Sequence, residues 1–237
     1  MTVVKDMTYT KVKDMTYTTT PRKTDKQIQL DVLAEIARDF RFKPAELGVE
    51  VDAGVVTLTG TVTSYPKLAL AAEIAGNVLS VKDVANKLTV EIAPYSVRDD
   101  TRIARAVRNA LEWDVTVPEE RIDSVIRNGV VTLKGTVDNW YERQAAADTI
   151  RNLLGVVSVN NHIVIAPSDR ADAATQDEVK SAFLRRFPLD EIDVIVDRGI
   201  VTLTGQVLSY RTRREAEAIA WSTPGVKTLT NKITVTL

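Results

Sequence analysis

The stretch Gly54-Val-Val-Thr-Leu-Thr-Gly60 decides the fold, because nearly the same seven residues occur three times in the chain. The stretch returns as Gly129-Val-Val-Thr-Leu-Lys-Gly135 and as Gly199-Ile-Val-Thr-Leu-Thr-Gly205, which places the copies 75 and then 70 residues apart. Valine, isoleucine and threonine favour strands, and the flanking glycines favour turns. The chain is therefore built around one strand used three times.

A second landmark shows that the repeated unit is a whole domain. Asn86-Lys-Leu-Thr-Val90 recurs as Asn161-His-Ile-Val-Ile165 and Asn231-Lys-Ile-Thr-Val235, with the same two offsets. A period of this length indicates tandem copies, each near the lower size limit for independent folding. We predict domains over residues 24–93, 97–166 and 171–237, preceded by a flexible, basic N-terminal tail over residues 1–23.

Within each copy the apolar spacing predicts the order helix, hairpin, helix, strand. Ile28, Val32, Ile36 and Phe40 recur every four residues, as on one face of a helix. A second helix is expected over about 65–79, 140–154 and 210–223, ended by left-handed Ser80, Gly155 and Gly225. The fold class is α+β: three α-β-β-α-β domains, each with two helices on one face of a three-stranded mixed sheet.

The third copy is shorter than the other two between its first helix and its turn. This shortening predicts a shorter first helix or a shorter connecting loop. Pro188 favours the first explanation, because proline removes a backbone donor and ends a helix.

The repeated glycines are expected to have conformational roles. Asn128-Gly129 is typical of a tight I′ hairpin turn, in which both residues take positive φ, and Gly54 and Gly199 occupy the same place. Gly60, Gly135 and Gly205 share the inward parity of the strand, where a missing side chain is expected to let a helix approach closely.

Composition excludes several classes of function. The 237 residues carry a formal net charge of −1 and no cysteine, so neither general attraction to nucleic acid nor disulfides and thiolate metal sites are expected. No apolar run reaches the length of a transmembrane helix, and the N-terminus lacks an apolar signal segment. We expect a cytoplasmic location.

The polar residues form no recognisable catalytic constellation. His162, the single histidine, occupies the strand position that Lys87 and Lys232 hold in the other copies, and is expected to be exposed. Asp99-Asp100 and Glu119-Glu120 fall at expected helix starts and loops, where the helix dipole and solvent explain them. We predict no enzyme activity, no cofactor, and no catalytic or metal site.

The repeated strand, the Ser80-Val81, Gly155-Val156 and Gly225-Val226 steps and the closing Asn86, Asn161 and Asn231 resemble the BON domain. The resemblance covers about residues 24–237 in three copies. It implies a non-catalytic module of bacterial osmotically inducible and nodulation proteins that binds phospholipid or membranes. Some relatives bind small ligands or potassium instead. Resemblance also implies a periplasmic or envelope location as the alternative to the cytoplasm.

Aromatic and basic residues at the start of each second helix form the candidate binding surface for a phospholipid or an anionic membrane. Amphipathic rings and cations are both favoured at a lipid headgroup interface. The alternatives are an aromatic plug that closes each small core, and a solvated helix face. The candidate residues are Tyr65, Lys67, Trp140, Tyr141, Arg143, Tyr210, Arg211, Arg213 and Arg214.

Two other functions stay open. Carboxylates and carbonyls in the hairpin turns suit a soluble sensor of a small ligand or a cation. Three linked domains with exposed sheet edges suit a protein-interaction or chaperone-like scaffold, or a homo-oligomer. Val125, Val130 and Val164 make the open sheet face of the central copy more apolar than the others, so we expect that face to pack on a neighbouring domain or a partner.

Overall fold

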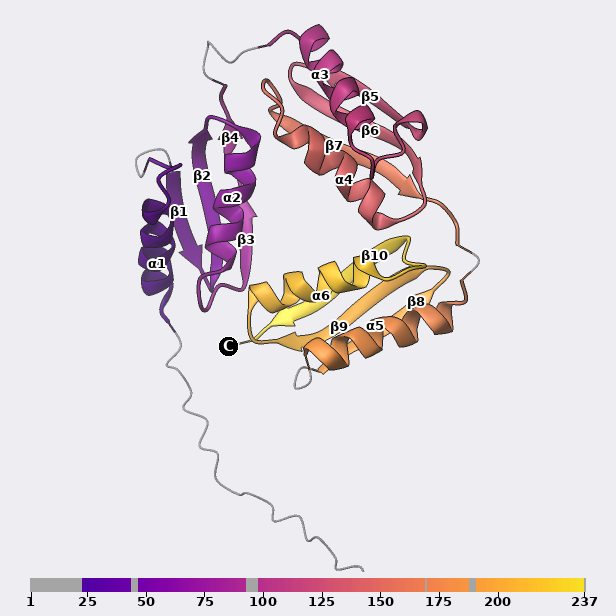
Figure 1. Cartoon of the computed structure of the whole chain (residues 1–237). Coiled ribbons are helices and arrows are strands. Elements are labelled where there is room, and N and C mark those ends of the chain that lie inside the picture. The colour runs from indigo at the N-terminus through magenta and orange to yellow at the C-terminus, as the bar shows by residue number, and fades with distance from the viewer. Residues whose placement is uncertain (1–22, 44–46, 93–97, 169, 188–190, 237) are drawn as a thin grey trace, which may run out of the picture.

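Three α+β units follow one another along the chain in the computed structural model (Figure 1). The structure describes residues 23–43, 47–92, 98–168, 170–187 and 191–236. The predicted flexible tail lies outside these residues except for Lys23, whose ammonium pairs with the Asp31 carboxylate at 2.6 Å. Among the described helices, none has the length and apolarity needed to cross a membrane.

Each unit has the predicted order of elements. The first contains α1 (Asp25–Arg38), β1 (Leu47–Asp52), β2 (Val55–Val62), α2 (Tyr65–Gly76), β3 (Asp83–Asn86) and β4 (Thr89–Val90). The second contains α3 (Asp100–Trp113), the 3-10 turn η3 (Glu119–Arg121), β5 (Ile122–Arg127), β6 (Val130–Val137), α4 (Trp140–Arg151) and β7 (Ser158–Ile165). The third contains α5 (Asp172–Arg186), β8 (Glu191–Asp197), β9 (Ile200–Val207), α6 (Tyr210–Ser222) and β10 (Thr228–Val235).

Each sheet is mixed, as predicted. The repeated strand is central: β2, β6 and β9 pair antiparallel with β1, β5 and β8 and parallel with the last strand of their unit. In the first unit β3 and β4 both pair with β2, so its last strand is interrupted. The α+β class and the α-β-β-α-β unit are confirmed.

The cores lie between the inner sheet faces and the two helices of each unit. In α1, Ile28, Val32 and Ile36 are buried as the four-residue spacing predicts. Phe40 breaks the prediction: α1 ends at Arg38, Phe40 is 95% exposed, and Phe42 enters the core instead. The buried residues of the central strands are Val56, Leu58, Val62, Val131, Leu133, Val137, Val201, Leu203 and Val207.

The hairpin turns have the predicted I′ geometry in all three units. Both central residues have positive φ, with values of 51° for Asn128 and 75° for Gly129. Ala53 and Arg198 adopt the same conformation before Gly54 and Gly199, at φ 49° and 52°. The turn therefore forms even where the residue before the glycine is unfavourable, which means that other contacts hold it.

A carboxylate on the first residue of each first helix supplies those contacts. The N–H groups of Asn128 and Gly129 donate to Asp100 at 2.8 and 3.0 Å. Asp25 accepts in the same way from the turn of the first unit, and Asp172 from the turn of the third. The acidic residue expected only to favour the helix dipole thus joins the helix to the hairpin.

Gly135 has a different role from the one predicted for the strand glycines. Gly135 has φ 145°, and a Cβ built on it would lie 2.1 Å from the carbonyl oxygen of Arg121. The close neighbour is therefore the backbone entering strand β5, and the expected helix is not among its nearest atoms. Gly60 and Gly205 share positive φ, at 118° and 133°.

The helix ends also correct two expectations. Helix α5 has 15 residues against 14 in α1 and α3, so the shortening in the third copy lies in the loop after the helix. Helices α2 and α4 end at Gly76 and Arg151, a few residues earlier than predicted. The left-handed residues that follow are confirmed, with φ 74° at Ser80, 95° at Gly155 and 94° at Gly225.

Candidate functional site

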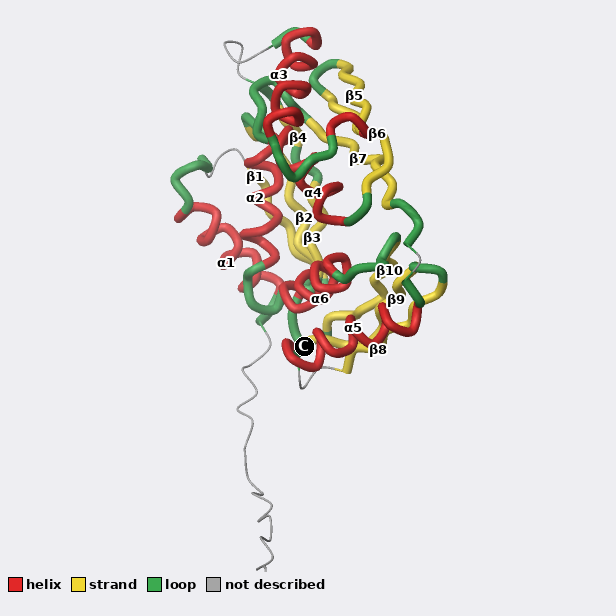
Figure 2. The backbone as a smooth tube through the Cα atoms, turned by 45° about the vertical axis from the view of Figure 1, so that its right-hand side comes forward, coloured by secondary structure: helices red, strands yellow, loops and turns green. Residues whose placement is uncertain are grey.

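The start of α6 meets the end of α2, so part of the predicted lipid surface lies between the third and first units (Figures 1 and 2). The backbone N–H of Tyr210 donates to the carbonyl of Val81 at 3.3 Å. The Tyr210 ring packs against the core of the first unit and lies over Gly76, where an added Cβ would be 2.5 Å from the ring. Tyr210 therefore fills a socket that only glycine leaves open.

Arg213, one turn along α6, adds a charged contact to the same junction. Its guanidinium donates to the Asp83 carboxylate at 3.0 Å, and the two side chains are 25% and 48% exposed. The guanidinium also stands over the Tyr210 ring, 5.3 Å from the centroid. Arg213 is thus held by a carboxylate and a ring, both within the junction.

The other end of α6 meets the start of α4 in a second junction. The Arg143 guanidinium lies 5.6 Å from the centroid of the Trp221 ring and donates to the carbonyl of Asn161 at 3.4 Å. Burial lowers the pKa of Arg143, and its Nε has no hydrogen-bond partner among the described residues. Trp221 packs against the cores of both the second and the third unit.

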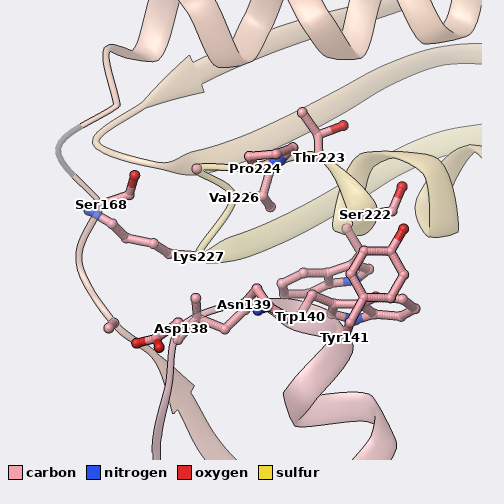
Figure 3. A pocket seen from close by; sticks show the side chains of 14 residues that line it. Asp138, Asn139, Trp140, Tyr141, Ser168, Ser222, Thr223, Pro224, Val226 and Lys227 are labelled. Atoms are coloured by element: carbon pink, nitrogen blue, oxygen red, sulfur yellow. The ribbon is translucent and has the colours of Figure 1, made fainter. Parts of the chain in front are cut away.

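A cavity of about 350 Å³ opens at this second junction. Figure 3 shows the rings of Trp140 and Tyr141 on one side of it and Lys227 and Ser168 toward the other. The two rings meet edge to face, with centroids 5.4 Å apart. Aromatic rings thus line one side of the cavity, and polar side chains lie toward the other.

The remaining predicted residues are more open to solvent. Arg211 is exposed, and the Arg214 side chain is 59% exposed and pairs with Glu217 at 3.1 Å on the same helix. Both arginines line a cavity of about 320 Å³ along α2 and the start of α6. Tyr141 is 60% exposed, whereas Tyr65 and Lys67 are half-buried on the first turn of α2.

The predicted residues therefore do not form one surface. Trp140, Arg143, Tyr210 and Arg213 lie at domain junctions, and Arg211 and Arg214 form a separate exposed pair. Sequence reasoning missed the residues that receive the junction contacts: Gly76, Asp83 and Trp221. The available signal was positional, since Gly76, Arg151 and Trp221 occupy the same place in the three second helices.

The polar residues for which the sequence predicted no catalytic role lie in the following environments. His162 is exposed on β7, as expected. Asp99 caps α3 by accepting from the N–H of Arg102 at 2.8 Å. Over the described ranges, no group of three or more His, Cys, Asp or Glu side chains is placed to hold a metal ion.

Within the part of the chain that the structure describes, no neighbouring domain covers the open face of the central sheet. Val125 and Val164 are 48% and 62% exposed, so the expectation that another domain of the chain covers them is wrong. Ile195 in β8, at the position equivalent to Val125, is 61% exposed. A partner molecule stays a prediction.

The three α-β-β-α-β units place the chain in a known class. The model of the BON domain matches residues 24–92, 99–167 and 171–236, and the chain belongs to the BON domain family. A relative in Escherichia coli K12, osmotically-inducible protein Y, is 32% identical over 143 residues, which covers 59% of this chain and 71% of the relative. The chain is therefore similar to an osmotic stress protein.

Two solved structures show partial likeness to the chain. The C-terminal domain of CdsD, a structural protein of the type III secretion system of Chlamydia trachomatis, is 14% identical with TM-score 0.25, covering 88% of this chain and 96% of that one. The PrgH periplasmic domain is 12% identical with TM-score 0.21, covering 81% and 96%. These scores are too low to carry an argument about fold or function.

One expectation is overturned by the relative. Osmotically-inducible protein Y is a periplasmic protein, which contradicts the cytoplasmic location expected from the sequence. The expectation was based on the lack of a transmembrane-length apolar run and of an apolar signal segment in the sequence, and it is wrong.

Proposed function

We propose that this chain is a non-catalytic, stress-associated binding protein that contacts anionic phospholipid surfaces through Arg211 and Arg214. Family membership and the osmotically inducible relative support the general role. The observation that carries the assignment to these residues is their exposure at the start of α6.

The electrostatics of α6 favour an anion at this place. The first turn of α6 contains no acidic residue, so the positive end of the helix dipole is not neutralised there. Two guanidiniums one turn apart present planar donor forks that suit phosphate oxygens. A headgroup phosphate at the mouth of the α2–α6 cavity would meet the dipole and the two cations, against one carboxylate in the cavity lining, that of Glu73.

The strength of the phosphate contact depends on the charged groups that already pair with the two arginines. Arg214 shares its guanidinium with Glu217 at 3.1 Å, an exposed pair of the kind that contributes only about 0.2–1 kcal/mol. A phosphate therefore competes with a weak partner. Because each surface cation contributes about 1 kcal/mol to binding an anionic membrane, two arginines give weak, salt-sensitive association.

Co-sedimentation with liposomes tests the proposal. The protein is expected to sediment with phosphatidylglycerol vesicles at low salt and to be released as the salt concentration rises. It is not expected to sediment with phosphatidylcholine vesicles. Arg211→Glu with Arg214→Glu should abolish sedimentation. The matched control is Arg105→Glu with Arg108→Glu, the same charge change at the same spacing at two exposed positions of α3. Equal loss in both variants would contradict a local site.

A protein-interaction scaffold is the second candidate, and the open sheet faces favour it. Val125, Val164 and Ile195 are large apolar side chains left in solvent on two of the three sheets, whereas Glu50 holds the position equivalent to Val125 in the first sheet. Val125→Asp with Val164→Asp should remove any self-association while leaving the melting temperature unchanged. A monomer in the unchanged protein at high concentration would weigh against homo-oligomers.

A further inference from the structure

We propose that Tyr210 and Arg213 form a latch that closes the three domains into a ring. The partner of this latch is the end of α2 in the same chain. The proposed phospholipid contact uses other side chains of α6, Arg211 and Arg214, which line the same α2–α6 cavity as Gly76 and Tyr210. The basis of the latch is the set of contacts between the third and first units.

Because of the order of the domains along the chain, the junction between the first and third units determines whether the ring is closed. The first and second units are joined by the chain, and so are the second and third, whereas Arg213 and Asp83 are 130 residues apart in sequence. Figure 1 shows the first and third units side by side at the start of α6. Non-covalent contacts alone therefore determine whether the ring is closed.

Shape is the main source of specificity in the latch. The atoms nearest to a Cβ built on Gly76 all belong to Tyr210, the closest at 2.5 Å. The end of α2 is thus built to accept an aromatic ring from another domain. The ion pair to Asp83 adds little energy by itself, because partly exposed pairs are weak, but it fixes the orientation of α6.

The same arrangement recurs at the second junction. Trp140 and Arg143 begin α4 with the spacing of Tyr210 and Arg213, and Arg143 stands over Trp221 at the end of α6. In both places an aromatic-x-x-Arg segment that starts one second helix meets the end of another. We infer that this segment is the docking element between BON domains in this chain.

The first copy lacks the complete segment. Leu68 replaces the arginine three residues after Tyr65, and Leu68 packs against the core of its own unit. The first unit therefore supplies a socket without carrying a full docking segment of its own. This asymmetry gives the ring a defined order of domains.

A distance measurement between the first and third units tests the latch. The chain has no cysteine, so Lys26→Cys and Lys180→Cys, both on exposed helix positions, give two unique spin-label sites. Double electron–electron resonance should give one narrow distance. Gly76→Leu should replace it with a broad distribution, because leucine fills the socket while suiting the helix better than glycine.

Two further variants separate a broken latch from damaged folding. Gly76→Leu combined with Tyr210→Ala restores space in the socket and should recover part of the narrow distance. Asp83→Arg alone should broaden the distribution, and Asp83→Arg with Arg213→Asp should narrow it again. Far-UV circular dichroism should remain unchanged in all of them.

Several results would overturn the proposal. A broad distribution in the otherwise unchanged protein, or an unaltered narrow distance after Gly76→Leu, would show that the latch does not hold the ring. Loss of the narrow distance on dilution with unlabelled protein would show that the contact joins two copies. Gly76 and Tyr210 also line the cavity beside Arg211 and Arg214, so liposome binding is measured on the same variants. An unaltered narrow distance refutes the latch whatever the liposomes show, and absence of liposome binding in the otherwise unchanged protein refutes the phospholipid contact alone.

Discussion

The Asp100 carboxylate joins α3 to the turn of the β5–β6 hairpin, and we call this contact the clamp. Replacing Asp100 with alanine tests whether the clamp stabilises the domain. The carboxylate accepts from two backbone N–H groups at 2.8 and 3.0 Å. The Asn128 amide is exposed and regains water when the carboxylate is lost, whereas the Gly129 amide is partly buried. The second bond therefore accounts for most of the cost.

The magnitude follows from these two bonds and the helix dipole. A hydrogen bond to a charged group contributes about 1.5–3 kcal/mol, and an acidic residue in the first helical turn adds about 0.3–1 kcal/mol. We expect Asp100→Ala to lower the free energy of unfolding of the second domain by about 2–3 kcal/mol. For a domain of this size that corresponds to roughly 10 °C or more in melting temperature.

Calorimetry with a matched control measures the effect. Asp123→Ala removes a carboxylate from an exposed position on β5 and should change stability by less than about 0.5 kcal/mol. Amide exchange at Gly129 should accelerate in Asp100→Ala alone. If Asp100→Ala and Asp123→Ala melt at the same temperature, the clamp has no structural importance and the reasoning is refuted.

Three further changes have expected outcomes. Gly135→Ala should cost at least about 1–3 kcal/mol in chemical denaturation, because φ is 145° and the new Cβ meets a backbone oxygen, and an unchanged midpoint would contradict this reading. Asn161→Ala should cost about 1–2 kcal/mol and Asn231→Ala less, because the Asn161 Nδ2 donates to the carbonyl of Arg143, whereas the Asn231 Nδ2 has no hydrogen-bond partner among the described residues. Hydrogen bonds from Thr116 and Thr149 lower the pKa of Asp114, so their stabilisation is present above the unfolded-state pKa and lost as pH falls through the folded-state value. Thr149→Val should therefore reduce the melting temperature at pH 6 more than at pH 3, and an equal loss at both would refute the assignment.

The fold could be predicted because its determinants are local and repeated three times. The turn at Asn128-Gly129 and the buried faces of the central strands follow from residue types and a period of two. Phe40 shows the limit of periodicity: it continues the spacing of α1, yet α1 stops at Arg38 and the ring points into solvent. A spacing rule does not say where a helix ends.

The junctions could not be predicted because their partners are distant in sequence. Tyr210 and Arg213 match the pattern of a membrane-facing aromatic and basic helix start, and the contacts to Gly76 and Asp83 depend on how whole domains are placed. The role of Asp100 was missed for a related reason, since a helix-start carboxylate looks the same whether or not a hairpin turn lies within reach.

The central claim is that Arg211 and Arg214 contact anions, whereas Arg213 on the same helix docks on the first domain. Liposome binding of three single variants tests this claim most directly. Arg211→Glu, Arg213→Glu and Arg214→Glu change the net charge equally, so general electrostatic attraction is matched and only position differs. Arg211→Glu and Arg214→Glu are expected to weaken binding to phosphatidylglycerol vesicles at low salt several-fold more than Arg213→Glu. Equal weakening by all three, or the greatest loss in Arg213→Glu, would contradict this claim.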